Sequence, residues 1–164
     1  MGDKRFLVTY YSRTGNTRKV AEAIFDALPE PKEIRPLGEV ESLAPYALTF
    51  VGFPLWQFAP APPAADFLKA KCEHARIAIF HTQGSPPDYW QVAETDDRLR
   101  GLFQAHVVDR FSCQGEVSED VIHMIESLPQ YAQFAATARR TKGLPDAAAL
   151  AEARAFAQRL AEIF

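Results

Sequence analysis

The sequence predicts a single α/β domain in which helices cover both faces of a doubly wound, five-stranded parallel sheet, giving three layers in the order α/β/α. Two observations carry this prediction. Apolar runs of strand length alternate along the chain with segments of helical periodicity, which is typical of successive β-α-β units. Two of these runs are apolar almost without interruption, as strands buried on both faces are. The length of 164 residues suits one domain with a sizeable core.

Five segments have the length and composition of strands. They are residues 5–10, 33–37, 47–53, 76–81 and 105–113. The second segment is short and carries a weak signal. The last segment has Asp109 and Arg110 in its middle, and charged residues of this kind are typical of an edge strand. We therefore expect residues 105–113 to lie at an edge of the sheet.

Helical patterns separate these strands. From residue 17, apolar side chains recur on one helical face until Pro29 ends the run. Residues 61–72 have prolines in their first turn, where a helix tolerates them. A helix over residues 89–102 would connect the fourth strand to the fifth. Asp146 can cap a final helix at the C-terminal end.

One segment, residues 115–145, is additional to this alternation. Ser118 can cap a helix with an apolar stripe, and Pro129 ends that helix. We expect the segment to form a lid or flap packed on the sheet. Because it begins and ends within the β-α-β pattern, we treat residues 1–164 as one domain.

Composition and charge exclude several functional classes. The net charge of −3 gives no sign of the basic face that binds nucleic acid. The two cysteines, Cys72 and Cys113, are too far apart for a metal-binding pair and form no disulfide framework, which indicates a reducing compartment. The four histidines have no metal-ligand spacing. We expect Cys113 to be a buried, inert thiol rather than a reactive one.

The chain gives no signal for membrane insertion or export. Residues 42–65 carry no charge, but five prolines interrupt them, and a spanning helix would not tolerate so many ring clashes and missing donors. The apolar run after Lys4 and Arg5 is too short for a signal peptide. We therefore expect a soluble, cytoplasmic protein.

The stretch YYSRTGNTRK, residues 10–19, follows the first predicted strand and opens the first predicted helix. A strand, a glycine-containing turn and a helix together form an anion site, because the first helical amides lack intrahelical partners and the helix dipole is positive there. Gly15 lets the backbone come close to a ligand, and nearby hydroxyls can donate to it. The spacing fits neither a P-loop nor the dinucleotide-binding glycine pattern. The alternative is an ordinary capped turn that binds nothing.

The stretch VTYYSRTGNTRKVAEAI, residues 8–24, resembles the N-terminal phosphate loop of flavodoxins, which hold flavin mononucleotide (FMN) non-covalently. The resemblance covers the order of strands and helices over most of the chain. It implies a flavodoxin-like sheet of order 2-1-3-4-5, with the flavin at the carboxyl ends of the strands. The loop residues that it assigns to the cofactor are Ser12, Arg13, Thr14, Gly15, Asn16 and Thr17.

Two further loops agree with this resemblance, FPLWQFAPAP after the third strand and HTQGSPPDYW after the fourth. In flavodoxins these loops supply aromatic residues to the two flavin faces, and a flat ring gains from aromatic neighbours at stacking distance. Trp56 matches one position, and Tyr89 or Trp90 matches the other. The alternatives are that Trp56 is a core anchor and that one of Tyr89 and Trp90 belongs to the core. The candidate cofactor residues here are Pro54, Leu55, Trp56, Thr82, Gln83, Gly84, Tyr89 and Trp90.

The chain departs from typical flavodoxins in places. The loop after the fourth strand has two prolines, Pro86 and Pro87, and the segment 115–145 is additional. The stretch FSCQGEVS brings Cys113 and Gly115 to the carboxyl end of the fifth strand, near the expected site. After Trp56 the chain has no glycine before residue 61, so any turn with positive φ there would be strained.

These observations predict an FMN-binding electron-transfer protein that serves a partner oxidoreductase of unknown identity, as a monomer or weak dimer. Two alternatives stay open. One is an FMN-dependent NAD(P)H or quinone reductase, and the other is a flavin-free protein that binds a phosphate ligand. The absence of a recognisable nicotinamide-binding loop favours the electron carrier over the reductase.

Overall fold

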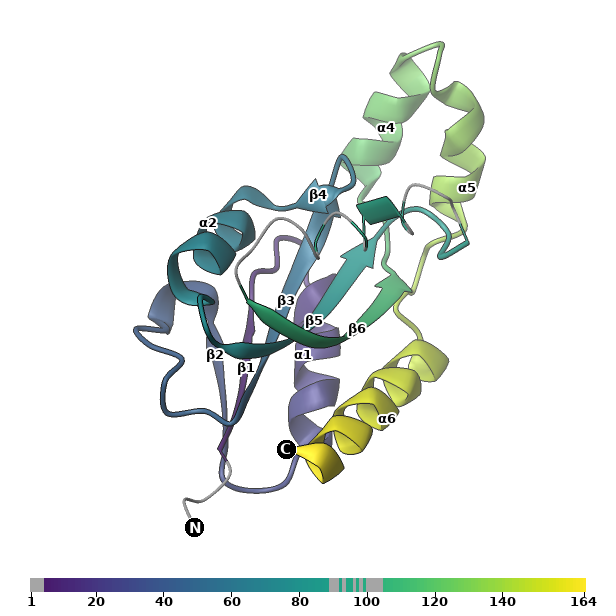
Figure 1. Cartoon of the computed structure of the whole chain (residues 1–164). Coiled ribbons are helices and arrows are strands. Elements are labelled where there is room, and N and C mark those ends of the chain that lie inside the picture. Colours follow the sequence, from purple (N-terminus) through teal and green to yellow (C-terminus); the bar gives the residue numbers. More distant parts are fainter. Residues whose placement is uncertain (1–4, 89–91, 93, 96, 98, 100–104) are drawn as a thin grey trace.

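In a computed structural model of the chain, a central sheet of order β2-β1-β3-β5-β6 is flanked by helices (Figure 1). The structure describes residues 5–88, 92, 94, 95, 97, 99 and 105–164. The strands are β1 (Phe6–Tyr10), β2 (Lys32–Pro36), β3 (Leu48–Trp56), β4 (Ala59–Pro60), β5 (Arg76–Gln83) and β6 (His106–Gln114). The helices are α1 (Asn16–Ala27), α2 (Pro62–Lys71), α4 (Glu119–Ser127), α5 (Ala135–Arg139) and α6 (Ala147–Ile163), with 3-10 turns η1 (Leu37–Glu39) and η2 (Ala132–Phe134).

The five predicted strands are confirmed, and they pair in parallel in the predicted order. Strand β6 lies at an edge of the sheet, as its charged residues predict. Strand β4 was not predicted, and it pairs antiparallel with the last two residues of β3. This pairing extends β3 to Trp56, so the third strand is longer than the apolar run alone indicates.

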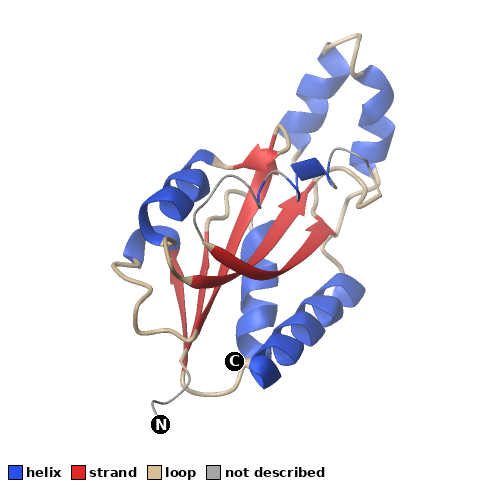
Figure 2. Ribbon diagram, viewed as in Figure 1, coloured by secondary structure: helices blue, strands red, loops and turns tan. Residues whose placement is uncertain are grey.

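Each face of the sheet carries its own apolar core, which gives the three layers that the sequence predicts (Figure 2). On one face, α1 and α6 bury Ile24 and Phe156 against Phe50. On the other face, α2 and η1 cover Phe53 and Ile79. Successive side chains of a strand point to opposite faces, so nearly continuous apolar strands supply both cores at once.

The centre of the sheet contains one close contact between neighbouring strands. Gly52 of β3 lies beside Phe80 of β5 in the strand register. A Cβ atom at Gly52 would lie 2.0 Å from the Phe80 ring, so the ring occupies the space that a side chain would need. Both positions belong to strands that lead directly to the candidate site.

The helix boundaries follow the predicted signals. Helix α1 ends just before Leu28 and Pro29, and helix α6 begins after Asp146, whose carboxylate accepts a hydrogen bond from the Ala149 amide at 3.0 Å. Of the predicted helix over residues 89–102, the described residues are helical, while Tyr89 and Trp90 lie outside the described residues. No helix in the described part of the chain is long and apolar enough to cross a membrane.

The additional segment is a helical hairpin, made of α4, η2 and α5, that extends beyond the carboxyl ends of the strands (Figure 1). The expectation of a flap packed on the sheet is therefore corrected. Helix α4 packs chiefly on η2 and α5, and neither core cluster includes a described residue of the hairpin. Among the described residues of α4, Ile122 alone is buried, and Met124 on the apolar stripe is 54% exposed.

Candidate functional site

The loop between β1 and α1 has the backbone of an anion site. Gly15 is the N-cap of α1 and has a φ of 99°, in the left-handed region that favours glycine. The Ser12 hydroxyl accepts hydrogen bonds from the Gly15 amide at 3.1 Å and the Arg18 amide at 3.3 Å. Ser12 thus caps the helix, as the capped-turn alternative requires, but its own proton remains available to a ligand. Among the described contacts, none occupies the amides of Asn16 and Thr17.

The hydroxyl-bearing residues of this loop differ sharply in exposure. Thr14 and the neighbouring Arg13 are exposed. Thr17 is only 1% exposed, and its hydroxyl oxygen lies 2.8 Å from that of Thr82, which is 2% exposed. Two candidate residues from different loops, 65 positions apart in the sequence, are therefore in direct contact.

Trp56 lies on the same side of the sheet end as this loop. Its side chain is 37% exposed, which excludes the core-anchor alternative. The Tyr11 ring meets the Trp56 ring edge-on at 6.2 Å, and the Arg13 guanidinium lies 5.9 Å from the centre of the indole. Pro54, Leu55 and Trp56 were predicted as loop residues, but they are the last residues of β3. The correction leaves Trp56 at the carboxyl end of its strand, where the site was expected.

A strained turn connects β3 to β4. Its two central residues, Gln57 and Phe58, have φ values of 51° and 60°, although neither is glycine. Two-residue hairpin turns with positive φ at both positions match the twist of the strands they join, which explains the geometry. The Thr95 hydroxyl donates to the Phe58 carbonyl at 2.8 Å and holds the turn in place.

At the end of β5, the side-chain nitrogen of a buried glutamine has no hydrogen-bond partner among the described residues. Thr82 and Gln83 were predicted as loop residues, and they are instead the last residues of this strand. The Gln83 side-chain oxygen lies 3.0 Å from Nδ1 of the buried His81, while the Gln83 side-chain nitrogen has no partner in the described part of the chain. Gln83 is only 6% exposed. A buried donor without an acceptor is costly, and its place at the sheet end fits a ligand that supplies the acceptor.

The junction of β6 and the hairpin closes the site from a third direction. The Asn16 side chain donates to the Glu116 carbonyl at 2.9 Å, and the Gly115 amide donates to the Gln83 carbonyl at 2.8 Å. A Cβ atom at Gly115 would lie 2.6 Å from the side-chain nitrogen of Asn16, so any other residue there would have to displace the Asn16 side chain. A Cβ atom at Gly84 would lie 2.7 Å from a Val117 methyl group. The Asn16 side chain therefore joins the loop to the start of the hairpin.

A cleft of about 590 Å³ opens beside the loop, over the carboxyl ends of β1 and β2. Tyr11, Ser12 and Arg13 line one wall, and residues 36–38 line another. The sequence analysis did not assign Tyr11 or residues 36–38 to the site. The only signal for them was their position at the ends of predicted strands, since Tyr11 directly follows residues 5–10 and residues 36–38 span the end of the predicted strand 33–37.

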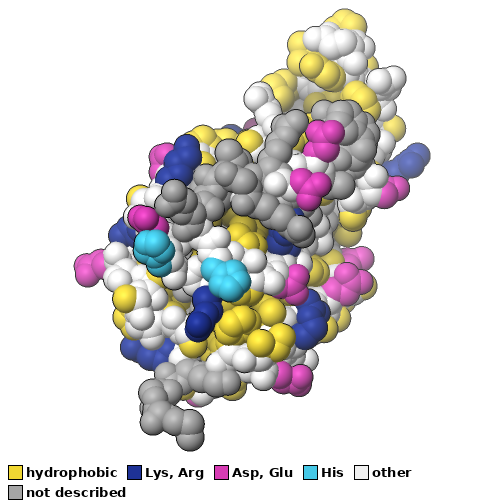
Figure 3. All heavy atoms as spheres, in the orientation of Figure 1, with side chains coloured by type: hydrophobic (Ala, Val, Ile, Leu, Met, Phe, Trp, Pro, Cys, Tyr) yellow, Lys and Arg dark blue, Asp and Glu magenta, His cyan; other side chains and the backbone are white. Residues whose placement is uncertain are grey.

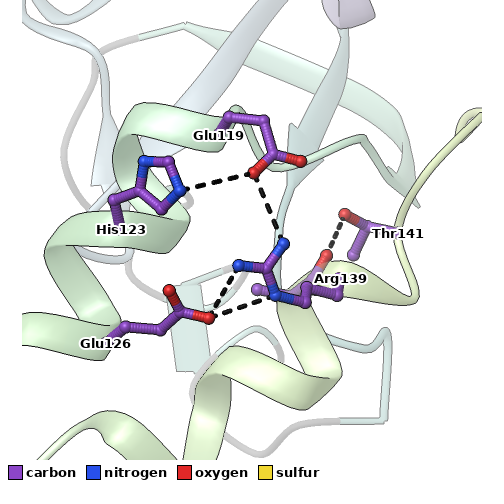
Figure 4. Close-up of polar contacts among 6 residues, drawn as sticks. Glu119, His123, Glu126, Arg139 and Thr141 are labelled. Carbon is purple, nitrogen blue, oxygen red and sulfur yellow. Dashed lines mark hydrogen bonds and ion pairs between the residues drawn. The ribbon is translucent and has the colours of Figure 1, made fainter.

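The hairpin beside the site is held together by charged side chains (Figure 4). Arg139 of α5 donates to Glu126 at 2.7 Å and to Glu119 at 3.4 Å, both on α4. Hydrophobic side chains gather on its surface (Figure 3). Met124, Tyr131 and Phe134 are large hydrophobic residues of the hairpin that are exposed.

The described residues give little support for chemistry at a reactive cysteine or at a metal ion. Cys113 is buried as predicted, and burial raises the pKa of its thiol to about 12, with smaller contributions from Glu152 and Asp146. Burial also raises the pKa of the Cys72 thiol to about 12. No group of His, Cys, Asp and Glu side chains among the described residues can hold a metal ion.

Comparisons with known proteins identify the family to which this chain belongs. Residues 7–159 match the family model of the flavodoxin domain. The flavodoxin-like domain-containing protein BilS of Clostridioides difficile (strain CD3) is 26% identical over 119 residues, which cover 69% of this chain and 67% of that protein. A flavodoxin from the domain Archaea superposes with a TM-score of 0.55 at 16% identity, over 97% of both chains. An azoreductase from Bacillus anthracis str. Sterne superposes with a TM-score of 0.56 at 15% identity, over 95% of this chain and 99% of that one. At these identities the two solved structures share the fold alone.

Proposed function

The chain belongs to the flavodoxin-domain family, and on this premise we propose that it binds FMN and passes electrons to or from a partner oxidoreductase. The observation that carries the proposal is the start of α1. There a left-handed glycine, two helical amides with no partner in the described part of the chain, and the available proton of Ser12 lie beside Trp56. This combination suits a phosphate group attached to a flat ring.

The residues present fit FMN in chemical type. Ser12, Thr14 and the first amides of α1 offer neutral donors to the phosphate. Trp56 offers an exposed aromatic face, and Gln83 offers a buried donor for which the described residues supply no acceptor. The flavin supplies the redox chemistry when bound, and the protein supplies position and electrostatics.

Titration of the apoprotein with FMN and with riboflavin tests the proposal. Thr14→Ala removes one exposed hydroxyl from the loop, and we expect FMN affinity to fall at least tenfold, since a hydrogen bond to a charged group contributes about 1.5–3 kcal/mol. Riboflavin lacks the phosphate, so its affinity should change little. Thr137→Ala, in the hairpin, is the matched control. Equal losses of affinity for FMN and riboflavin would show that the phosphate does not bind at this loop. Failure of the wild-type chain to bind either flavin would refute the proposal.

A second candidate function is an FMN-dependent NAD(P)H or quinone reductase. The cleft of about 590 Å³ beside Arg13 favours it, because the cleft offers room for a second small molecule next to the loop. Anaerobic mixing of the FMN-loaded protein with NAD(P)H separates the two functions. Rapid bleaching without a partner protein supports the reductase, and bleaching only after addition of a partner reductase supports the electron carrier.

A further inference from the structure

We propose that Thr82 acts through Thr17 on the phosphate group, as the second hydroxyl of a two-step hydrogen-bond relay. Thr82 is therefore a positioning residue and has no direct contact with the flavin. This inference rests on the proposed function, and it assigns Thr82 a role different from that of the neighbouring residues at the end of β5.

The contact itself is well defined. The two hydroxyl oxygens lie 2.8 Å apart, and both side chains are almost completely buried. Thr17 is the second residue of α1, where the helix amides and dipole favour an anion. Thr82 comes from the sheet, so the contact joins the start of the helix to the end of β5.

The surroundings of Thr82 offer little competition for its proton. Its neighbours in the strand register are Pro54 on β3 and Cys113 on β6. Proline has no polar side-chain group, and a thiol is a weak acceptor. Neither threonine side chain has another hydrogen bond among the described residues.

Counting protons determines the direction of the relay. Each hydroxyl has one proton, and only one proton lies between two oxygens in contact. If Thr17 donated to Thr82, the lone pairs of Thr17 would face an anion at the helix start. If Thr82 donates to Thr17, the Thr17 proton is directed to that anion. A bound phosphate selects the second arrangement, in which the two hydrogen bonds polarise and strengthen each other.

A double-mutant cycle in the full chain tests the relay. Thr82→Val removes the hydroxyl at nearly constant volume, Thr82→Ser keeps it, and Thr17→Val removes the acceptor. We expect Thr82→Val to weaken FMN binding about threefold to tenfold, the range for one uncharged hydrogen bond, and to change riboflavin binding less than about twofold. Thr82→Ser should retain most of the wild-type FMN affinity.

The decisive measurement is the effect of Thr82→Val in the Thr17→Val background. A relay predicts that the second substitution adds less than about a twofold loss there, because nothing remains to be oriented. Equal losses in both backgrounds, or equal losses for FMN and riboflavin, would overturn the relay while leaving FMN binding intact. Urea unfolding of each apoprotein separates these results from loss of folding. A wild-type chain with no preference for FMN would overturn the proposed function itself.

Discussion

The thiols of Cys72 and Cys113 lie in different cores of the molecule, and burial makes both of them unreactive. Cys72 belongs to the core under α2, and Cys113 belongs to the core under α1 and α6. A thiolate is the reactive form of cysteine, and a thiol pKa of about 12 leaves almost none of it at neutral pH. Although Cys113 stands at the end of β6 next to the candidate site, its thiol is therefore a poor candidate for chemistry there.

Alkylation tests this directly. We expect no labelling of the folded protein by iodoacetamide within minutes at about pH 8, and labelling of both cysteines after unfolding in urea, as followed by intact mass. Cys113→Ser should leave the flavin affinity unchanged. Rapid labelling of Cys113 in the folded chain would show that the site exposes a reactive thiol.

From the sequence, a site residue could be predicted only where a local motif identifies it. The pattern around Gly15 identified the loop, because a left-handed N-cap is a local property of the chain. The same pattern could not show that Thr17 bonds to Thr82, or that Asn16 bonds to Glu116. Those partners are 65 and 100 residues away in the sequence, and only tertiary packing brings them together.

Among the structural elements, the turn between β3 and β4 stores backbone strain. A non-glycine residue in the left-handed region costs about 1–2 kcal/mol, and the turn contains two such residues in succession, Gln57 and Phe58. Strain that persists beside a ligand site is often linked to its function.

Replacing Gln57 with glycine should relieve part of this strain. We expect Gln57→Gly to raise the free energy of unfolding of the apoprotein by up to about 1 kcal/mol, measured by urea denaturation. Gln57→Val should lower it, because a β-branched residue tolerates this conformation poorly. Gln133→Gly in η2 is the control, since glycine should destabilise a helical turn. Destabilisation by glycine at position 57 would contradict the interpretation that this turn is strained.

The hairpin is a second separable element. The Val117 amide donates to the Thr141 hydroxyl at 2.8 Å, and the Glu116 amide donates to the Leu144 carbonyl at 3.0 Å. The two ends of the hairpin are therefore adjacent in space. A short glycine-serine linker can join Val117 to Thr141 without moving either residue.

Deleting residues 118–140 with such a linker should leave a folded domain, because the described residues of both core clusters lie outside the hairpin. We expect the thermal midpoint to change by only a few degrees and the FMN affinity to remain within about threefold of that of the full chain. If the hairpin docks a partner, electron exchange with that partner should slow. Loss of the folded state would instead make the hairpin part of the core.

The sequence predicted the existence of the main elements better than their ends and contacts. The strands were identified because their apolar runs are local. The extension of β3 to Trp56 depends on pairing with β4, which the periodicity of the run does not contain. The apolar stripe of α4 predicted the helix correctly but not its surroundings, because the helix packs on its own hairpin instead of on the sheet and leaves Met124 of the stripe 54% exposed.

For the whole molecule, the fold could be predicted because alternating strands and helices permit few arrangements.

One charged cluster joins the starts of three strands. Glu33 of β2 accepts a hydrogen bond from the Tyr46 hydroxyl at 3.0 Å and forms ion pairs with Arg35 and Arg5. The Tyr46 hydrogen bond, followed by the two arginines, lowers the pKa of the Glu33 carboxyl below its ordinary value.

This cluster predicts a pH dependence of stability. A carboxyl with a lowered pKa in the folded state stabilises the protein fully above its unfolded pKa, and the contribution is lost as the pH falls through the folded pKa. We expect Glu33→Gln to lower the free energy of unfolding at about pH 7, and the difference from the wild type to shrink below about pH 4. Urea denaturation at both pH values measures it. A difference that stays constant with pH would contradict the ionic origin.

The contact between Gly52 and Phe80 has a consequence for how this sequence can diverge. Since the Phe80 ring fills the place of a Cβ atom at position 52, a substitution at either position should require a compensating change at the other. Gly52→Ala would overpack the sheet centre, and the loss of the ring at position 80 would leave a void. Among homologous chains the two positions should therefore be inherited as a pair, with alanine or larger at position 52 only where position 80 carries a smaller side chain. A lineage that has acquired the first change without the second should carry a compensating shift of β5.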